Sequence, residues 1–266
     1  MRVRITFLPK CTKNAILPLD HHPFQALIYH SVAEAAPEYA NALHQQGYGS
    51  EFSSKRFRLF VFSRCYLPDP QVRQASRVKD GHLVFPPGPV EWEVCSPMPD
   101  FIQAFVGGLA MKQSVTIRDS YAAQHLDIAE IAIIEPPRFI ERMFFHTISP
   151  ITVSTTDQNP DGSPGKHYVR AGDERFGPLV RINLIEKFRA LAGCDPLDSS
   201  LYFEFDRDYI RKRGGVDRIS KLVQFKETRI KAFQAPFVVT GSVELIQLGW
   251  ECGFGNANSQ GFGMVE

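Results

Sequence analysis

The sequence has 266 residues, of which 44% are hydrophobic and 22% are charged, and its formal net charge is +1. This composition suits a soluble globular protein with one large or two small domains, of which two are favoured. No apolar run approaches the roughly 18 residues that cross a bilayer, and "MRVRITFLPK" alternates in hydrophobicity, so a membrane span and a signal peptide are excluded and a cytoplasmic protein is expected.

The first half of the chain predicts a ferredoxin-like order of elements. In chain order we expect a strand over 3–9, a helix over 22–47, a strand over 57–65, a pair of strands around 86–89, a helix over 98–111 and a strand over 114–120. The order β-α-β-β-α-β is the ferredoxin-like pattern. We therefore expect an N-terminal ferredoxin-like domain over residues 1–130.

A second run of the same kind follows a join near "EIAIIEPPRFIE". In chain order we expect a strand over 143–155, a Gly/Pro-rich hairpin over 157–169, a helix over 178–193, strands from 201 to 239, a short helix over 242–253, a glycine-rich loop and a final strand over 261–266. The two halves show no visible sequence identity. Their similar order nevertheless predicts an α+β fold of two tandem ferredoxin-like domains, the second over residues 131–266 with a glycine-rich loop at 253–263.

Positive charge is concentrated between Asp206 and Lys231. This segment has nine Lys and Arg residues against four acidic residues, a net +5 that leaves −4 for the rest of the chain. Such a stretch is most often a solvated face, but "KLVQFKETRIKAF" alternates basic and apolar residues as a strand with one charged side does. A strand of this kind suits a phosphate backbone. The candidate RNA-binding cations are Arg211, Lys212, Arg213, Lys226, Arg229 and Lys231.

The stretch "GFGNANSQGFGM" at 253–264 has four glycines in twelve positions. Glycine permits positive φ and lets the backbone lie close to a ligand, so the stretch is either a phosphate cradle or a tight turn. It lacks the Lys-Ser/Thr ending of a P-loop and the strand–helix context of a Rossmann motif. Composition alone therefore favours a turn.

Cysteine and histidine patterns give no sign of a disulfide framework or a metal site. The five cysteines are scattered without a CxxC pair, which argues against disulfides and structural zinc. The one adjacent histidine pair, His21 and His22, cannot direct both rings to the same face of a helix or strand. We expect no metal and no cofactor.

Three stretches together resemble the CRISPR-associated repeat endoribonucleases, the Cas-six family. They are the ending "ELIQLGWECGFGNANSQGFGMV", the "HTISPITV" that opens the second half, and the N-terminal "LPLDHHPFQALIYHSVAEAAPEYANALH". The resemblance covers nearly the whole chain. The terminal loop is its strongest mark, because two Gly-Phe-Gly ends around a polar Asn/Ser stretch match the family's loop in composition and position.

The resemblance implies an enzyme that binds the repeat of a precursor CRISPR RNA and cuts it once without a metal ion. It also implies two ferredoxin-like (RRM-like, RAMP) domains side by side, with the glycine loop shaping the RNA-binding surface between them. The loop residues implied in RNA binding are Gly253, Gly255, Asn256, Ser259, Gly261 and Gly263.

The chemistry of such a cut needs three groups. An RNA is cut by its own 2′-OH when one group removes that proton, another protonates the departing 5′ oxygen and a cation stabilises the phosphorane. Members of the family use a histidine, often a tyrosine, and a nearby lysine, and the resemblance places His44, Tyr29 and Lys55 at the matching positions. The expected products are a 2′,3′-cyclic phosphate and a 5′-OH.

Helix geometry tests the pairing of Tyr29 and His44. In one continuous helix the two would lie roughly 22 Å apart at about 1.5 Å per residue, too far to act on one phosphate. Pro37 suits the first turn of a second helix, so a break there would fold His44 back towards Tyr29. The connection after His44 is longer than the family pattern, which leaves Arg56 or Arg58 as alternatives to Lys55 for the catalytic cation.

Other interpretations stay open at this point. Taken singly, Tyr29 fits a core tyrosine, His44 a helix end favoured by the dipole, and Lys55 an exposed charge. A non-catalytic RNA-binding subunit of a CRISPR effector complex would share the fold and the loop, and a nucleotide-binding or metabolic protein would share only the fold. The expected partners are the precursor RNA repeat and other effector-complex subunits, with the chain a monomer or a homodimer.

Overall fold

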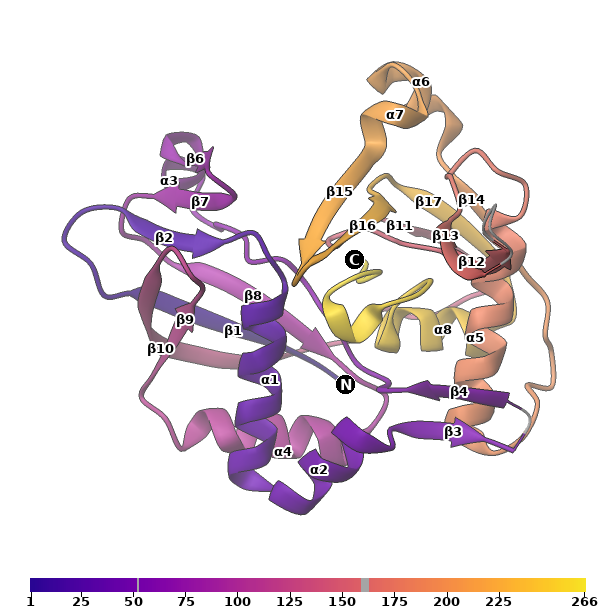
Figure 1. Ribbon diagram of the computed structural model, residues 1–266, viewed down its shortest axis with the longest axis horizontal. Coiled ribbons are helices and arrows are strands. Elements are labelled where there is room, and N and C mark those ends of the chain that lie inside the picture. The colour runs from indigo at the N-terminus through magenta and orange to yellow at the C-terminus, as the bar shows by residue number, and fades with distance from the viewer. Residues whose placement is uncertain (52, 159–162) are drawn as a thin grey trace. The chain divides into compact units, whose positions relative to one another are not determined.

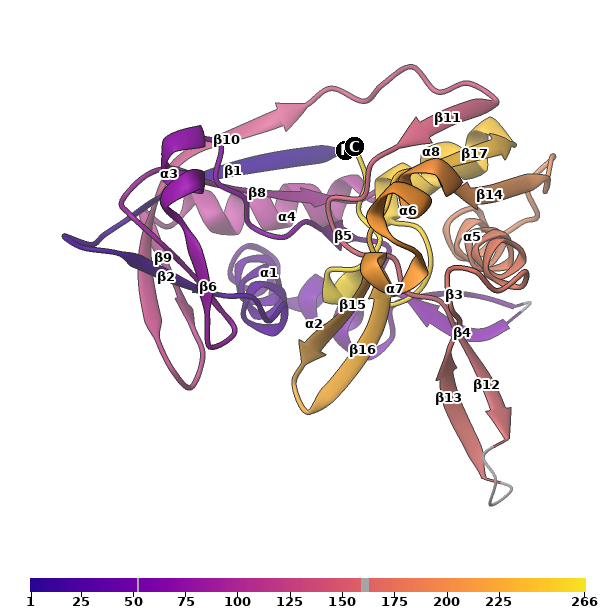
Figure 2. The same cartoon turned by 90° about the horizontal axis from the view of Figure 1, so that it is seen from above.

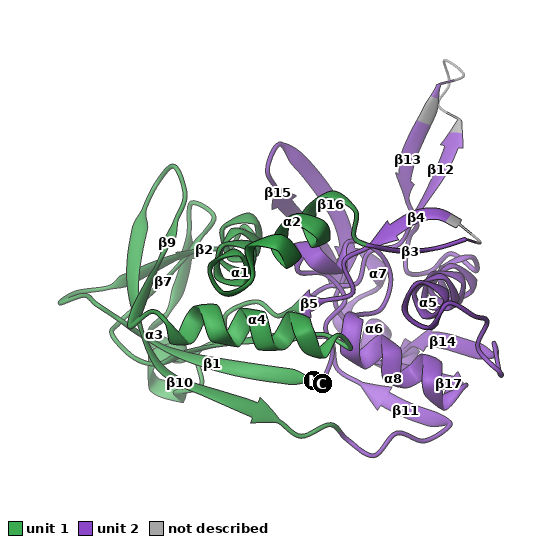
Figure 3. Cartoon of the chain, turned by 90° about the horizontal axis from the view of Figure 1, so that it is seen from below, with its two compact units in different colours: residues 1–47, 62–136 green, residues 48–61, 137–266 purple. Residues whose placement is uncertain are grey.

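The structure of the protein is a computed structural model that describes residues 1–51, 53–158 and 163–266. The chain forms two compact units: Met1–Gly47 with Phe62–Pro136, and Tyr48–Val61 with Pro137–Glu266 (Figure 3). The segment Tyr48–Val61 therefore belongs to the second unit although it interrupts the first along the chain. The domain boundary expected after residue 130 stays a prediction, whereas the units divide after Pro136.

The first unit contains an antiparallel sheet with the strand order β5-β8-β1-β10-β9 (Figure 1). Its main elements are β1 (Arg2–Pro9), α1 (His22–Ala35), α2 (Pro37–Gln45), β5 (Val61–Phe62), β8 (Val90–Cys95), α4 (Pro99–Ala110), β9 (Ser114–Arg118) and β10 (Ala123–Ile134). Both neighbours of β1 in the sheet, β8 and β10, run antiparallel to it. The series β1-α1-β5-β8-α4-β10 is a ferredoxin-like order.

A smaller sheet with the order β2-β7-β6 completes the description of the first unit. Its elements are β2 (Ala15–Pro18), the short helix α3 (Pro70–Ala75), β6 (Arg77–Lys79) and β7 (His82–Phe85). Asp69 caps α3, because its side chain accepts a hydrogen bond from the backbone N–H of Gln71.

Alternation along β1 decides which face of the large sheet is covered by helices. Val3, Ile5 and Phe7 share one face and are at most 1% exposed. Trp92, which pairs in register with Ile5, contacts the rings of Phe7 and of Phe24 in α1. The apolar residues of β1 and β8 therefore form the core beneath the helices.

Helices α1 and α4 approach each other closely at one glycine. A Cβ on Gly108 would lie 1.8 Å from the carbonyl oxygen of Ser31. No other residue type fits at this crossing without moving a helix, so Gly108 sets the distance between α1 and α4.

The second unit has a sheet with the order β11-β17-β14. Its main elements are β3 (Tyr48–Ser50), β4 (Ser53–Phe57), β11 (Arg142–Phe145), β12 (Ser154–Gln158), β13 (Pro164–Tyr168), α5 (Phe176–Ala192), β14 (Leu201–Phe205), α6 (Arg207–Arg213), α7 (Val216–Ile219), β15 (Ser220–Phe225), β16 (Thr228–Phe233), β17 (Phe237–Gly241), α8 (Val243–Cys252) and the 3₁₀ turn η1 (Asn258–Gln260). The series β11-α5-β14-β17-α8 repeats the ferredoxin-like order up to its last strand.

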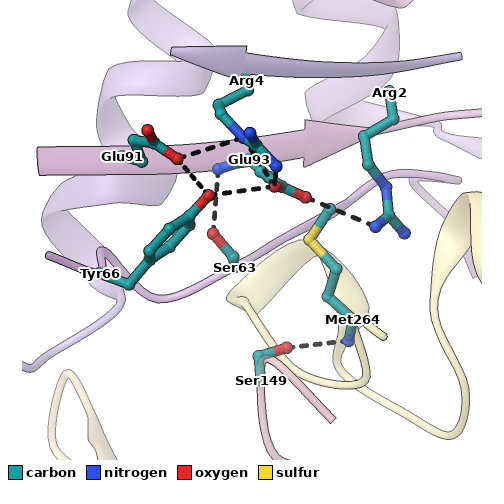
Figure 4. Close-up of polar contacts among 8 residues, drawn as sticks. All are labelled: Arg2, Arg4, Ser63, Tyr66, Glu91, Glu93, Ser149 and Met264. Atoms are coloured by element: carbon teal, nitrogen blue, oxygen red, sulfur yellow. Dashed lines mark hydrogen bonds and ion pairs between the residues drawn. The ribbon is translucent and has the colours of Figure 1, made fainter. Parts of the chain in front are cut away.

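The end of the chain provides that last pairing. His146 and Glu266 exchange two backbone hydrogen bonds, and Thr147 forms an antiparallel bridge with Val265. The backbone N–H of Met264 also donates to the hydroxyl of Ser149, 2.8 Å away (Figure 4). The predicted fold class of two tandem ferredoxin-like domains is therefore confirmed.

Aromatic rings fill the core of the second unit. The rings of Phe203 and Phe237 lie 4.5 Å apart between centroids, and Phe254 lies 5.2 Å from Phe237. Phe254 belongs to the glycine loop and is completely buried. The loop is therefore packed on the sheet of the second unit.

The structure also differs from the expected elements in the second half. The strand expected over 143–155 ends at Phe145, and the chain then runs through single bridges before β12 begins at Ser154. The stretch expected as strands from 201 to 239 contains α6 and α7, because Asp206 caps a helix by accepting a hydrogen bond from the backbone N–H of Tyr209. Part of the expected Gly/Pro-rich hairpin, at 159–162, lies outside the described residues.

Candidate functional site

Tyr29 and His44 lie in contact, on two consecutive helices of the first unit. Helix α1 ends at Ala35, Ala36 leaves the helical conformation with φ −149° and ψ 75°, and α2 begins at Pro37. The ring centroids of Tyr29 and His44 are 5.4 Å apart and their planes meet at 79°. His44 is exposed and Tyr29 half-buried. The break at Pro37 thus brings the two side chains together, while their catalytic roles stay a prediction.

The candidate cations lie in the second unit. Lys55 is on β4, and its Nζ lies 2.7 Å from a carboxylate oxygen of Glu186 in α5. The guanidinium of Arg56 lies over Gly49, since a Cβ there would be 1.7 Å from Nη1. Arg58 is half-buried. The ammonium of Lys55 is therefore paired with a carboxylate. It would have to leave or share this ion pair before it could stabilise charge in a reaction.

The stretch predicted as a strand with one charged side forms a hairpin of two strands, β15 and β16, which lie side by side in Figure 2. Lys226 occupies its turn with φ +53° and is exposed. Arg229 is exposed and Lys231 half-buried on β16, opposite Gln224 and Leu222. The alternate residues of both strands are buried. The hairpin therefore has one apolar face and one face that offers cations, as the alternation predicts.

The other three candidate cations belong to α6. Arg211 forms an ion pair with Asp208 at 3.0 Å, with both side chains exposed. Arg213 donates from Nε to the hydroxyl of Tyr209 at 3.2 Å and lies over its ring, 5.2 Å from the centroid. Lys212 is exposed. All three cations remain accessible to an anionic ligand.

The glycines of the C-terminal loop have positive φ: +87° at Gly253, +74° at Gly255, +85° at Gly261 and +84° at Gly263. Two of them also face protein backbone. A Cβ would lie 2.5 Å from the carbonyl oxygen of Thr152 at Gly255, and 2.0 Å from that of Phe254 at Gly263. The loop is therefore a tightly packed turn in which the glycines are required by contacts inside the second unit. A role in RNA binding stays a prediction.

Two asparagines hold the loop in shape. The side-chain oxygen of Asn256 accepts a hydrogen bond from the backbone N–H of Ser154 at 3.0 Å. The side-chain nitrogen of Asn258 donates to the carbonyl oxygens of Phe254 at 3.2 Å and Phe262 at 2.8 Å. Asn256 thus has a structural role, and Ser259, on the same loop, is half-buried.

A lysine that the sequence analysis did not identify anchors the same loop. Lys187 of α5 is 2% exposed, and its Nζ donates to the carbonyl oxygens of Gly253 at 2.7 Å and Gly255 at 3.0 Å. Burial lowers the pKa of Lys187 to about 8. Lys187 follows Val180 by seven residues and Leu184 by three, which places it on the buried face of α5. This helical spacing is the sequence pattern from which its burial could have been predicted.

A cluster of oppositely charged side chains that pair with one another occupies the face of the first sheet that lies opposite α1 and α4 (Figure 4). Arg4 lies 2.8 Å from Glu93 and 3.3 Å from Glu91, and Arg2 lies 3.4 Å from Glu93. Tyr66 donates its hydroxyl to Glu91, and burial together with this hydrogen bond raises the pKa of Tyr66. Two guanidinium groups thus face two carboxylates, and Tyr66 acts as a neutral donor.

Within residues 1–51, 53–158 and 163–266, no group of three or more His, Cys, Asp or Glu side chains is placed to hold a metal ion. No helix in this described part of the chain is long and apolar enough to cross a membrane.

Comparisons with known proteins agree over the whole chain. The sequence matches the family model "CRISPR-associated protein Cas6, N-terminal" over residues 16–123 and the model "CRISPR associated protein Cas6, C-terminal" over residues 134–266.

Individual proteins show the same similarity. The chain is 28% identical over 254 residues to the CRISPR-associated endoribonuclease Cas6 1 of Methanocaldococcus jannaschii, covering 94% of this chain and 87% of the relative. It is 26% identical over 275 residues to the CRISPR-associated endoribonuclease Cas6 of Pyrococcus furiosus, covering 100% and 89%. A solved structure described as a RAMP protein binding different RNA substrates has the same fold, with a TM-score of 0.81, 21% identity and coverage of 100% and 98%.

Proposed function

Since the chain belongs to the Cas6 family of CRISPR-associated proteins, we propose that it is a metal-independent endoribonuclease that binds the repeat of precursor CRISPR RNA in the cytoplasm and cuts it to give guide RNAs. The observation that carries this proposal is the contact of Tyr29 with the exposed imidazole of His44, 5.4 Å between ring centroids. An exposed imidazole beside a phenol supplies proton-transfer chemistry near neutral pH without a metal ion.

The reaction uses a hydroxyl of the RNA itself. The 2′-OH loses its proton, its oxygen forms a bond to the adjacent phosphorus, the bond from phosphorus to the 5′ oxygen breaks, and that oxygen takes a proton. His44 serves as the general base or the general acid, and Tyr29 holds the imidazole or a phosphate oxygen in place. The products are a 2′,3′-cyclic phosphate and a 5′-OH.

The charge that develops on the phosphorane requires a cation. Lys55 is proposed for this role, and its ion pair with Glu186 at 2.7 Å must then open or be shared when RNA binds. Arg56 and Arg58 are the alternatives. Single alanine variants of the three residues separate them, because the catalytic cation lowers the rate constant of cleavage far more than it lowers affinity.

Binding of the repeat is assigned to the second unit. The exposed cations of the β15–β16 hairpin and of α6 supply phosphate contacts, since such contacts position a nucleic acid without specifying its sequence. The glycine loop supports this surface from within the second unit. Single-turnover cleavage of the repeat distinguishes an enzyme from a subunit that binds RNA without cutting it.

The decisive experiment compares His44→Ala with wild type in single-turnover cleavage with excess EDTA. We expect the rate constant to fall by roughly 10² or more while repeat affinity stays nearly unchanged, because proton transfer acts in the transition state. His30→Ala is the matched control, since His30 is an exposed histidine of α1. Tyr29→Phe keeps the ring and removes the hydroxyl.

The substrate provides the second test. A 2′-deoxy nucleotide before the cut must abolish cleavage, and the products of the native repeat must carry the end groups named above. Cleavage at the wild-type rate by His44→Ala, or of the deoxy substrate, would show that this mechanism is wrong.

A further inference from the structure

A small pocket in the second unit is lined by basic side chains that the cleavage chemistry does not use. It has a volume of about 330 Å³ and lies where the chain continues from β11, beside α6, α7 and the start of β15. Figure 3 shows these elements within the second unit. Its polar lining consists mainly of His146, Tyr209, Arg213, Arg218, Lys221 and Gln234.

The charge of this lining is of one sign. No Asp or Glu is among the described residues that line the pocket. The neighbouring hollow on the same unit differs, because Glu204, Asp206 and Asp208 border it together with its arginines. A pocket with several cations and no carboxylate favours an anion of several oxygens, such as a phosphate.

The cations of the pocket are also available to a ligand. Within the described part of the chain, neither Arg218 nor Lys221 has a carboxylate within ion-pair distance. Both side chains are exposed. Arg213 is held by the hydroxyl and the ring of Tyr209 through its Nε side. This hold fixes the direction of the guanidinium while its terminal nitrogens stay accessible.

An exposed aromatic ring, that of Phe144, contacts His146 of the pocket and itself lines the neighbouring hollow that the carboxylates border. Phe144 is 50% exposed and its ring meets that of His146 edge-on, with 5.0 Å between centroids. The two residues are separated by one position along the chain, so both side chains are on the same face of the sheet. Phe145, between them, is 1% exposed and points into the core.

We propose that this pocket binds a phosphate of single-stranded RNA through Arg213, Arg218 and Lys221, while the ring of Phe144 stacks on a neighbouring unpaired base. The proposal deepens the proposed function and rests on it in assigning the strand to the repeat substrate. Cations alone would serve any polyanion, but a cationic pocket beside an exposed aromatic ring on a sheet face matches the two needs of an unpaired nucleotide. A duplex would bury its bases and leave Phe144 without a function.

Binding of a short oligouridylate to the full-length protein tests this assignment independently of cleavage. We expect Arg218→Ala with Lys221→Ala to weaken binding by about tenfold and to lower the slope of log K against log salt by roughly 0.7 for each phosphate that is no longer neutralised. Phe144→Leu should weaken binding by about tenfold with an unchanged salt slope, because stacking releases no counterions. The different salt behaviour separates the two contacts.

The control variant is Arg77→Ala with Lys79→Ala, which removes two exposed cations from β6 of the first unit. It should bind like wild type, and all variants should keep the wild-type melting temperature. Photocrosslinking of a 4-thiouridine oligonucleotide should label the peptide that contains Phe144. Inorganic phosphate should compete no better than potassium sulfate of equal ionic strength.

The outcomes distinguish this inference from the proposed function. If wild type cuts the repeat but the pocket variants and Phe144→Leu bind oligouridylate normally, the inference is wrong and the function stands. If the variants lose binding as expected but wild type cuts no repeat, the pocket is supported and the cleavage proposal fails. Specific competition by inorganic phosphate alone would overturn the assignment to RNA.

Discussion

The two units share one topology but differ in the chemistry of the sheet face that lies opposite their helices. In the first unit this face has Arg4 between two glutamates, and the side chain of Glu93 is only 6% exposed. In the second unit the corresponding face displays Phe144 and Tyr202, which are 50% and 75% exposed. The topology sets where side chains alternate, and the residues at those positions decide whether a face is closed by ion pairs or is left to a ligand.

The largest expected effect tests the closed face. Glu93→Ala leaves the buried Arg2 and the neighbouring Arg4 without their shared carboxylate, so we expect the free energy of unfolding to fall by about 3–5 kcal/mol. Glu204→Ala is the matched control on the other sheet, where the ion pair with Arg207 is largely exposed and the loss should stay within about 0.5 kcal/mol. Urea denaturation measures both, and equal losses would contradict the comparison.

A second prediction compares a closely packed glycine of the C-terminal loop with a glycine that has open space around it. Gly263→Val places a Cβ against the carbonyl oxygen of Phe254 in a left-handed conformation, so a loss of about 3 kcal/mol is expected. Gly193→Ala, with φ +72° and open space around it, should cost only about 1–2 kcal/mol. Thermal and urea unfolding report both values. Similar losses of stability in the two variants would mean that positive φ alone, and not close packing, explains why the loop requires glycine at position 263.

The hairpin tests whether the exposed cations of the second unit are used in binding. Replacing Lys226, Arg229 and Lys231 together by alanine should weaken repeat affinity by about ten- to a hundredfold and lower the salt slope by up to roughly 0.7 for each phosphate that these cations neutralise. Removing Arg77 and Lys79 of the first unit provides the control. An unchanged salt slope in the hairpin variant would remove this segment from the interface.

The smallest effect concerns the buried lysine behind the glycine loop. Burial lowers the pKa of Lys187 to about 8 from an ordinary value of 10.5, so above pH 8 the unfolded chain holds a proton that the folded chain has released. Stability should therefore rise with pH relative to Lys187→Met, by about 1 kcal/mol between pH 7 and 9. Urea unfolding of both proteins across this range measures it, and parallel profiles would contradict the shift.

Local signals explain the parts of the fold that the sequence predicts. Alternation at Val3, Ile5 and Phe7 indicates a strand with one buried face, and Pro37 marks the break between α1 and α2. The pairing of His44 with Tyr29 came from the family resemblance, and the proline showed only how two short helices allow such a contact.

Contacts between residues that are far apart along the chain could not be predicted from the sequence. Lys187 acts through carbonyl groups of Gly253 and Gly255 that are more than sixty residues away. The ion pair of Lys55 with Glu186 likewise joins segments that no local pattern connects. The inclusion of residues 48–61 in the second unit follows from packing of β3 and β4 on α5, which periodicity does not reveal.

The backbone pairing of His146 with Glu266 has a consequence for biosynthesis. The strands of the first unit are complete once Ile134 has been made, whereas the second sheet lacks its last partner until Glu266 has left the ribosome. Closing the chain between His146 and Glu266 costs conformational entropy before any contact compensates for it, so we expect the second unit to fold late and more slowly than its size suggests. Until α5 has been made, residues 48–61 lack their partner helix, and the nascent chain exposes strand edges that a chaperone can cover.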